Sequence, residues 1–297
     1  MESSPTPPKL TLVGAGRLGR TLARLWADSG VFTIGEVITR HPASALDAVN
    51  FIGQGTPRSI PESSLRADVL LLAVPDDQLA AVATSLTDQI DIAPGSIAFH
   101  CSGALDAACL APLRDKGAAV ASAHPMHSFA DPHASLETFT GTFCALEGDA
   151  TALAQLEPAF ATIGGRPLRI AAEAKLLYHA GGVFAANYVT ALLATATRLV
   201  EAAGVSSDEA RALLAPLLRG AVESGLKLGP GAALTGPIAR GDSDLVARQA
   251  KAVTDHDAEL GTLYRALGHA TLKLACERDE LDQAQLSAIA KALSVPE

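Results

Sequence analysis

Short apolar runs alternate with amphipathic stretches over roughly the first 165 residues. Apolar runs of this length, bounded by Gly, Pro, Asn or Asp, are typical of strands. The uninterrupted run ADVLLLAVPDD indicates a central parallel strand that is buried on both faces. Leu18, Leu22, Leu25 and Trp26 recur at helical spacing, and Gly30 is a suitable stop. The predicted strands cover 9–16, 35–40, 67–77, 95–104, 117–125 and 141–149, with a short one at 51–53.

This alternation predicts an α/β Rossmann fold, a doubly wound and mostly parallel sheet, over residues 9–170. Long Ala- and Leu-rich segments follow, interrupted by GVSSDEA and ARGDSD, whose Ser and Asp residues are typical helix N-caps. Residues 171–297 are therefore expected to form an all-α substrate and dimerisation domain. The polar, Pro-rich residues 1–8 are expected to be a disordered tail.

One helical segment carries no charge. Residues 176–197 contain no Asp, Glu, Lys or Arg. A segment of this length is long enough to span a bilayer. The same segment holds Tyr178, His179, Asn187 and several Thr, so a helix buried on all sides is the simpler interpretation. Because a small domain buries such a helix better with a second subunit, we expect a homodimer through the C-terminal helices.

The formal net charge of −9 argues against nucleic acid and against an anionic membrane surface as partners. The four cysteines are few and scattered over 297 residues, and the N-terminal tail lacks the pattern of a secretory signal. We therefore expect reduced thiols in a cytoplasmic protein.

GAGRLG places Gly14, Gly16 and Gly19 in G-x-G-x-x-G spacing, between a predicted strand and a predicted helix. In this context the first glycine permits a tight turn, the second lets a pyrophosphate approach and the third allows close helix packing. Main-chain N–H groups at the helix start then bind the phosphates. The predicted dinucleotide-binding residues of this loop are Gly14, Ala15, Gly16, Arg17, Leu18 and Gly19.

The end of the second predicted strand favours NADP over NAD. An NAD site needs a carboxylate there, but the segment reads ITRHP, and Glu36 comes too early. Thr39 and Arg40 stand where the 2′-phosphate of NADP is expected, and a guanidinium binds phosphate bidentately. An ordinary surface arginine is the alternative. Val74 and Pro75, after the next long strand, are expected near the ribose of the cofactor.

SAHPMHSF holds His124 and His127 three residues apart. His124 follows a predicted strand at the edge where ligands of such sheets bind. Ser102 follows the neighbouring strand, where it either binds substrate or stabilises a turn. We predict that His124 or His179 donates a proton and that Ser102 and His127 contact substrate.

A metal site would gather His100, Cys101, Cys109, His124 and His127. Pro125 disfavours a helical H-x-x-H pair, and His100 and Cys101 are adjacent, so they point to opposite faces of a strand. No metal is therefore expected. Cys101 and Cys109 are interpreted as small buried apolar residues, although a thiol before a helix start is the alternative.

The segments VGAGRLG, HCSGA, AHPMHSF, KLLYHAGGVFAANY and ALTGPIARGD, in this order, resemble Rossmann-like proteins with a DUF2520 C-terminal domain. That family is similar in organisation to pyrroline-5-carboxylate reductases and to NADP-dependent oxidoreductases of the 6-phosphogluconate dehydrogenase type. The resemblance implies an NADP-binding domain and a helical dimerisation domain. The Lys-x-x-Asn motif of related dehydrogenases is not matched here, so their catalytic lysine is not carried over.

Lys175 and His179 lie one turn apart on a predicted helix, with Asn187 two turns further. These polar groups, together with Thr235 and Arg240 of ALTGPIARGD, bind substrate or else bind main-chain groups and a second subunit. Asp242 is interpreted as a helix N-cap.

The sequence thus predicts an NADP(H)-dependent oxidoreductase that reduces a small C=O or C=N substrate of the 2-oxo acid or imine type. A non-catalytic NADP-binding regulatory protein is the main alternative. A metal-dependent hydrolase around His124 and His127 is the third.

Overall fold

The computed structural model describes residues 6–59 and 65–295. Residues 1–5 of the predicted disordered tail lie outside the described residues. The chain divides into two compact units, Met1–Ala186 and Asn187–Glu297. This division falls after α7, later than the boundary predicted at residue 170, so the first turns of the uncharged segment belong to the N-terminal unit.

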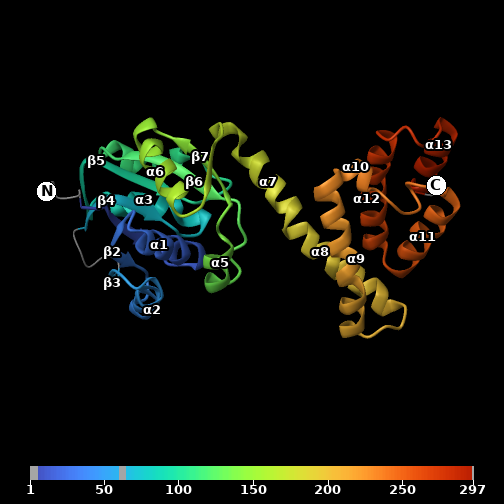
Figure 1. Cartoon of the computed structure of the whole chain (residues 1–297), viewed down its shortest axis with the longest axis horizontal. Helices are drawn as coiled ribbons and strands as arrows, with labels where there is room; N and C mark the ends of the chain where they lie inside the picture. Colours follow the sequence, from blue (N-terminus) through green and yellow to red (C-terminus); the bar gives the residue numbers. More distant parts are fainter. Residues whose placement is uncertain (1–5, 60–64, 296–297) are drawn as a thin grey trace. The chain divides into compact units, whose positions relative to one another are not determined.

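The N-terminal unit is built on one sheet, in which the described residues form eight strands in the order β3-β2-β1-β4-β5-β6-β7-β8 (Figure 1). Neighbours are parallel except β6 and β7, which are antiparallel. The predicted Rossmann fold is therefore confirmed. The strands are β1 (Lys9–Val13), β2 (Thr33–Ile38), β3 (Thr56–Arg58), β4 (Leu65–Leu72), β5 (Ile90–His100), β6 (Ala119–Pro125), β7 (Phe143–Gly148) and β8 (Arg166–Arg169).

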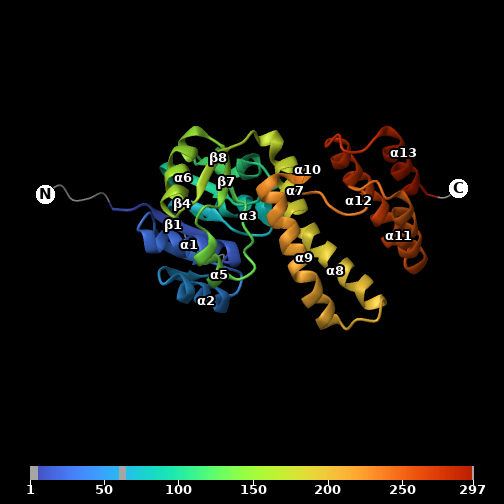
Figure 2. The ribbon, with the colours of Figure 1, turned by 45° about the vertical axis from the view of Figure 1, so that its right-hand side comes forward.

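Helices cover both faces of this sheet, and β7 and β8 lie beside α6 (Figure 2). The α-helices of this unit are α1 (Arg17–Ser29), α2 (Pro42–Ile52), α3 (Leu79–Leu86), α4 (Ala111–Asp115), α5 (Pro132–Thr138), α6 (Ala150–Thr162) and α7 (Lys175–Ala185). Three 3₁₀ turns connect them, η1 (Asp76–Gln78), η2 (Ala107–Leu110) and η3 (Ala172–Ala174).

Successive residues of the central strands enter two different cores. Val69 and Leu71 of β4 pack in the core that also holds Trp26, whereas Leu70 and Leu72 pack in the core on the other face. Because both faces are buried there, β4 needs apolar residues at each position from Val69 to Leu72, which explains the continuous apolar run in its second half. The Trp26 indole donates to the main-chain carbonyl of Ala159, 3.0 Å away, so its polar atom is satisfied inside the core.

The strand predicted at 51–53 is wrong. Phe51 and Ile52 end α2, and Gly53 is its C-cap in the left-handed region at φ 80°. A short apolar run followed by glycine fits a helix end as well as a strand. The third strand is Thr56–Arg58, and the second ends at Ile38 rather than at residue 40.

The C-terminal unit is helical, as predicted. Its helices are α8 (Asn187–Ala202), α9 (Ser207–Leu228), α10 (Pro230–Ala233), α11 (Ser243–His256), α12 (Ala258–Cys276) and α13 (Gln283–Ala292). Two predicted N-caps are confirmed, because Ser206 accepts from the N–H of Glu209 and Asp242 accepts from the N–H of Leu245. α11, α12 and α13 enclose a small core of their own around Val246 and Ile289.

The uncharged segment is not buried within a single copy of the chain, so its predicted burial would require the second subunit that the sequence also predicts. α8 has no buried residue among those described, and Leu177 and Phe184 of α7 are 81% and 67% exposed. The stretch Ala172–Ala202, which contains an 18-residue window of mean hydropathy 1.4, is long and apolar enough to cross a membrane by length and composition alone. Exposed apolar side chains in such number are typical of a surface that contacts another protein or a membrane.

Candidate active site

The glycine loop joins β1 to α1 at the carboxyl end of the sheet. Gly14 has φ +84°, and its N–H donates to the carbonyl of Ile38. A Cβ atom on Gly14 would lie 2.5 Å from the carbonyl oxygen of Ala73, and one on Gly19 would lie 2.7 Å from the Ala73 Cβ. Both glycines are thus required by packing of the loop and α1 against the chain that follows β4.

Gly16 differs from its two neighbours. A Cβ atom there would meet nothing within 4 Å, and the residue is exposed. Gly16 is the N-cap of α1, where no side chain caps the helix and no acidic residue lies in the first turn. The first N–H groups of a helix lack intrahelical acceptors, so this end offers donors to an anion. The open space beside Gly16 fits the pyrophosphate of a dinucleotide.

The other residues of the loop are divided between core and surface. Ala15 and Leu18 pack against the hydrophobic core, and Ala15 also accepts from the Arg20 side chain through its carbonyl. Arg17, the first residue of α1, is exposed. Val74, after β4, lies against Gly14, and Pro75 precedes η1.

The residues that follow β2 include an exposed arginine, whereas the nearest acid lies inside the strand and is ion-paired. Glu36 lies inside β2 and pairs with Arg58 at 2.9 Å and with Lys9 at 3.8 Å. Arg40 follows the strand, is exposed, and forms no ion pair with any described residue. The Thr39 hydroxyl donates to the carbonyl of His41 and fixes this turn before α2. The arrangement fits a 2′-phosphate better than a bare ribose hydroxyl.

His124 of β6 meets Tyr178 and His179 of α7. Its imidazole ring lies 5.8 Å from the Tyr178 ring and 5.6 Å from the His179 ring, centroid to centroid, with both pairs edge to face. Gly103 occupies the space between the two histidines, since a Cβ atom there would come within 3 Å of both rings. Met126 packs against Gly182 one turn further along α7. The AHPMHSF segment and the first half of α7 therefore form one contact.

Three buried polar atoms of this cluster have no hydrogen-bond partner among the described residues. They are the Nδ1 atoms of His124 and His179 and the hydroxyl of Tyr178. Most buried polar groups in proteins are satisfied, so an unpaired group at the mouth of a sheet needs an explanation. A bound substrate with its own donors and acceptors would provide one.

Burial sets the protonation states of His124 and Tyr178. It lowers the pKa of His124 to about 4, with help from the charge of Lys175 and from His179. It raises the pKa of the Tyr178 phenol. At neutral pH His124 is therefore an uncharged imidazole and Tyr178 keeps its proton.

Lys175 is almost completely buried, with 1% exposure, at the start of α7. Its ammonium donates to the carbonyl oxygen of Ser102 at 3.0 Å and to the hydroxyl of Ser122 at 2.5 Å, and lies 4.0 Å from the Glu147 carboxylate. Burial lowers the pKa of Lys175 and raises that of Glu147. The lysine thus joins β6, β7 and the turn that follows β5 to α7, and its ammonium is surrounded by protein.

Ser102 and His100 are also satisfied within the fold. The Ser102 hydroxyl donates to Asp76 at 2.7 Å and accepts from the N–H groups of Ala104 and Leu105. His100 accepts from the Ser102 N–H through Nδ1, so its Nε2 carries the proton that it donates to the Asp106 carbonyl. Because the Ser102 hydroxyl already has these partners, the structure favours a role in stabilising the turn over a role in binding substrate.

The remaining predicted residues are His127 of the N-terminal unit and three residues of the C-terminal unit. His127 is within 3.4 Å of the hydroxyls of Thr138 and Thr142 and packs against Phe129. Asn187 begins α8, and Thr235 and Arg240 are exposed in the segment before α11, all in the C-terminal unit. Their substrate contacts stay predictions.

The cysteines favour the apolar interpretation. Cys101 is buried, and burial raises its thiol pKa, while that of Cys109 rises to about 11 for the same reason. A thiol in such surroundings is a poor nucleophile at neutral pH. Among the described residues no group of three or more His, Cys, Asp or Glu could hold a metal ion.

Several residues of the cluster escaped the sequence analysis. Tyr178 is adjacent to His179 but has no spacing of its own that indicates a functional role, and Gly103 and Ser122 carry no pattern in isolation. Glu147 had a usable signal, because it is an acid within the apolar run FCALEG and such acids are rarely buried without a partner.

Two family models match the chain. Residues 3–125 match a Rossmann-like domain, and residues 142–271 match DUF2520, a domain of unknown function. No curated protein matches it significantly.

Solved structures share the fold over nearly the whole chain. The protein TM1727 from Thermotoga maritima is 25% identical, with a TM-score of 0.71 over 90% of this chain and 98% of that one. The "putative NADP oxidoreductase" BF3122 from Bacteroides fragilis is 20% identical, with a TM-score of 0.72 over 90% and 98%. A pyrroline-5-carboxylate reductase from Coxiella burnetii is 17% identical, with a TM-score of 0.56 over 97% and 99%. The chain thus combines, in this order, a region that matches a Rossmann-like domain and a region that matches DUF2520.

Proposed function

We propose that this protein is an NADP(H)-dependent oxidoreductase that reduces a small C=O or C=N compound. The proposal rests on three polar groups, on His124, Tyr178 and His179, at the carboxyl end of the sheet. None of the three has a hydrogen-bond partner among the described residues. A protein that only binds a dinucleotide has no need of such groups. The fold neighbours named as an NADP oxidoreductase and a pyrroline-5-carboxylate reductase support the same class.

The glycine loop from Gly14 to Gly19 would hold the pyrophosphate, and Thr39 and Arg40 would hold the 2′-phosphate. Val74 and Pro75 would border the ribose. When bound, the cofactor supplies a hydride to the substrate carbon. The space beside Gly16 and the unpaired Arg40 guanidinium are the observations that fit such a ligand.

The residues of the chain then have to deliver a proton to the substrate oxygen or nitrogen. The Tyr178 phenol, protonated and partly buried, is suited to donate it. His124, uncharged at neutral pH, is suited to donate an N–H hydrogen bond to the reacting atom rather than to act as a cationic acid. His179 remains the second candidate donor. The alcohol or amine product keeps the donated proton.

Steady-state assays with NADPH and a panel of 2-oxo acids and cyclic imines test this proposal. We expect at least one class to oxidise NADPH, and Tyr178→Phe to lower kcat by about 10²-fold or more, the range of general acid catalysis. Tight NADPH binding without turnover of any panel member would instead support the non-catalytic regulatory protein.

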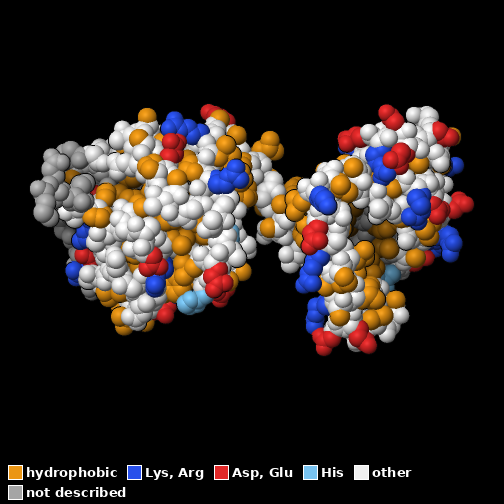
Figure 3. Space-filling model, viewed as in Figure 1, with side chains coloured by type: hydrophobic (Ala, Val, Ile, Leu, Met, Phe, Trp, Pro, Cys, Tyr) orange, Lys and Arg blue, Asp and Glu red, His pale blue; other side chains and the backbone are white. Residues whose placement is uncertain are grey.

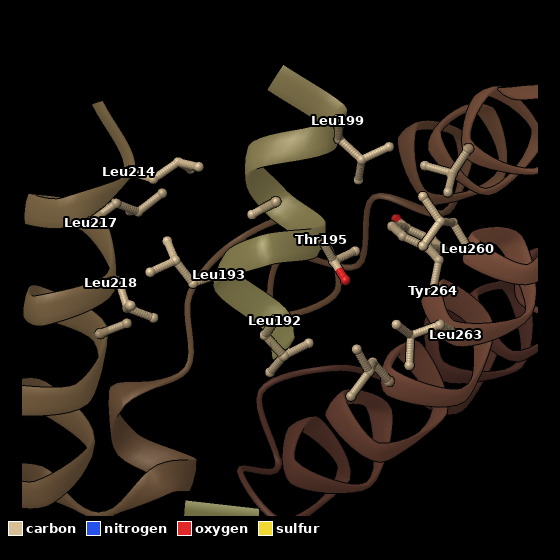
Figure 4. A pocket seen from close by; sticks show the side chains of 14 residues that line it. Leu192, Leu193, Thr195, Leu199, Leu214, Leu217, Leu218, Leu260, Leu263 and Tyr264 are labelled. Atoms are coloured by element: carbon tan, nitrogen blue, oxygen red, sulfur yellow. The ribbon is translucent and has the colours of Figure 1, made fainter. Parts of the chain in front are cut away.

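We further propose that a second copy of this chain covers the apolar helices. Hydrophobic side chains gather along α8 and α9 (Figure 3), where Leu217 and Leu226 are 69% and 84% exposed. A cavity of about 360 Å³ lies between α8, α9 and α12. Leu192 and Thr195 of α8 point toward Leu263 across it (Figure 4). Obligate homodimer interfaces have this apolar character, so the exposed stretch favours a dimer over a membrane span.

A further inference from the structure

A second hollow lies within the C-terminal unit, between α11, α12 and α13, and measures about 1350 Å³. Small residues widen it, among them Ala247 of α11, Gly261 of α12 and Ala288 of α13. The close approach of α11 to α12 depends on Gly261, where a Cβ atom would collide with Thr254. The hollow is thus a consequence of how the three helices pack, and it is independent of the glycine loop.

α12 presents two different faces. Leu260, Leu263 and Leu267 line the apolar cavity next to α8 and α9, whereas Arg265 and His269 line this second hollow. Arg265 and His269 are one helical turn apart, so they lie on the same side of α12. The polar face of α12 therefore opens into the hollow.

Arg265 lacks the partner that its position requires. Within the part of the chain that the structure describes, its buried guanidinium nitrogen Nη1 makes no hydrogen bond and the residue forms no ion pair. A buried donor left without an acceptor is costly, more so when it is charged. An acceptor that enters the hollow would remove this cost.

The charges that line the hollow leave a positive excess. Lys251 and Asp255 are paired with each other at 2.5 Å. Arg265 and Lys291 then face one remaining carboxylate, Asp244, and neither is paired with it. A local excess of positive charge is notable in a chain whose net charge is −9. The planar guanidinium fork matches the paired oxygens of a carboxylate or phosphate.

We propose that this hollow is a binding site for a small oxyanion, a carboxylate or a phosphate, held by Arg265 with Lys291 and His269 at its rim. The site lies in the C-terminal unit, with Arg265 and His269 inside the region that matches DUF2520 and Lys291 beyond it, and it does not depend on the proposed reductase activity. It gives the C-terminal unit a ligand of its own in addition to its helical contacts.

The test is isothermal titration of the full-length protein at constant ionic strength with inorganic phosphate and, separately, with malonate. We expect saturable binding of at least one of the two, and the stronger binder identifies the chemistry. Arg265→Gln should weaken it at least tenfold. The matched control is Arg248→Gln, which removes the same charge from an exposed position on α11 outside the hollow and should leave affinity unchanged.

Two results would overturn the proposal. One is binding of neither anion by the wild type. The other is equal affinity in the wild type and Arg265→Gln, which would move the anion elsewhere, for example to the start of α1. Should Arg265→Gln fail to fold, Lys291→Gln serves instead, with an expected loss of about threefold or more from one removed charge, and unchanged affinity in that variant would also contradict the site.

Discussion

Gly14 and Gly16 are two residues apart, yet they tolerate a methyl group differently. Gly16→Ala should change the free energy of unfolding by no more than about 1 kcal/mol, a usual N-cap effect, while weakening NADPH binding more than tenfold. Gly14→Ala should destabilise the protein by about 1–3 kcal/mol, because it has a positive φ and a carbonyl at 2.5 Å from the added atom. Urea denaturation and fluorescence titration with NADPH separate the two effects. Equal NADPH affinity in Gly16→Ala and wild type would show that the pyrophosphate does not bind at this loop.

Arg40 carries the choice between the two nicotinamide cofactors. Arg40→Ala should weaken NADPH binding more than tenfold and leave NADH binding nearly unchanged, because NADH has no 2′-phosphate. Titration of both cofactors against both proteins measures the difference. An equal loss for NADPH and NADH would exclude Arg40 as the reader of the 2′-phosphate.

His100 makes stability depend on pH. Its pKa falls from 6.5 to about 4, chiefly because it is buried. The unfolded chain therefore takes up a proton first as the pH falls below 6.5, and stability is lost until about pH 4. A difference of about 2.5 units corresponds to roughly 3 kcal/mol. Urea denaturation between pH 7 and 4 should show this loss in the wild type and a correspondingly smaller one in His100→Gln. Parallel curves for both proteins would contradict it.

At the scale of elements, the start of α7 is fixed by one ammonium group. Lys175→Met keeps the length of the side chain but leaves the Ser102 carbonyl, the Ser122 hydroxyl and Glu147 without their shared donor. The variant should lose about 2–5 kcal/mol of stability in urea denaturation, since the buried Glu147 carboxylate keeps the N–H of Ala107 but loses the cation that faces it. The control is Lys116→Met, at an exposed position after α4, with an expected change within about 0.5 kcal/mol. A similar small change in Lys175→Met would mean that Glu147 and the serines find other partners.

Elements with a strong hydrophobic periodicity could be predicted from the sequence, and elements with a short or weak pattern could not. The run that became β4 and the spacing that became α1 are long and regular. β8 was missed because RPLR is a short edge strand with largely exposed residues and no apolar pattern. The reversal of β7 against β6 has no local signal, since it depends on how α5 and its loops return the chain.

The candidate site follows the same rule. The glycine loop and His124 could be predicted because they sit at strand ends, where position alone indicates function. The contact of His124 with Tyr178 could not, because it depends on where α7 packs, about fifty residues later in the chain.

At the scale of the whole molecule, the exposed leucines predict how copies associate. Leu217→Glu combined with Leu226→Glu should convert a dimer into a monomer, because a charge cannot be buried unpaired in an apolar interface. Light scattering coupled to size-exclusion chromatography measures the mass. Glu substitutions at Leu46, which is 52% exposed in the N-terminal unit, provide the control and should leave the mass unchanged. A monomeric wild-type protein would contradict the proposal that a second copy covers α8 and α9.

The buried ammonium of Lys175 also bears on synthesis of the chain. It bonds to the carbonyl of Ser102, 73 residues earlier. A growing chain that has emerged only to the end of β8 has every strand of the sheet but lacks the cation for Glu147 and Ser122. The N-terminal half is therefore expected to remain open on the ribosome until α7 has emerged, and a fragment cut at residue 170 should be less stable than one cut at residue 186.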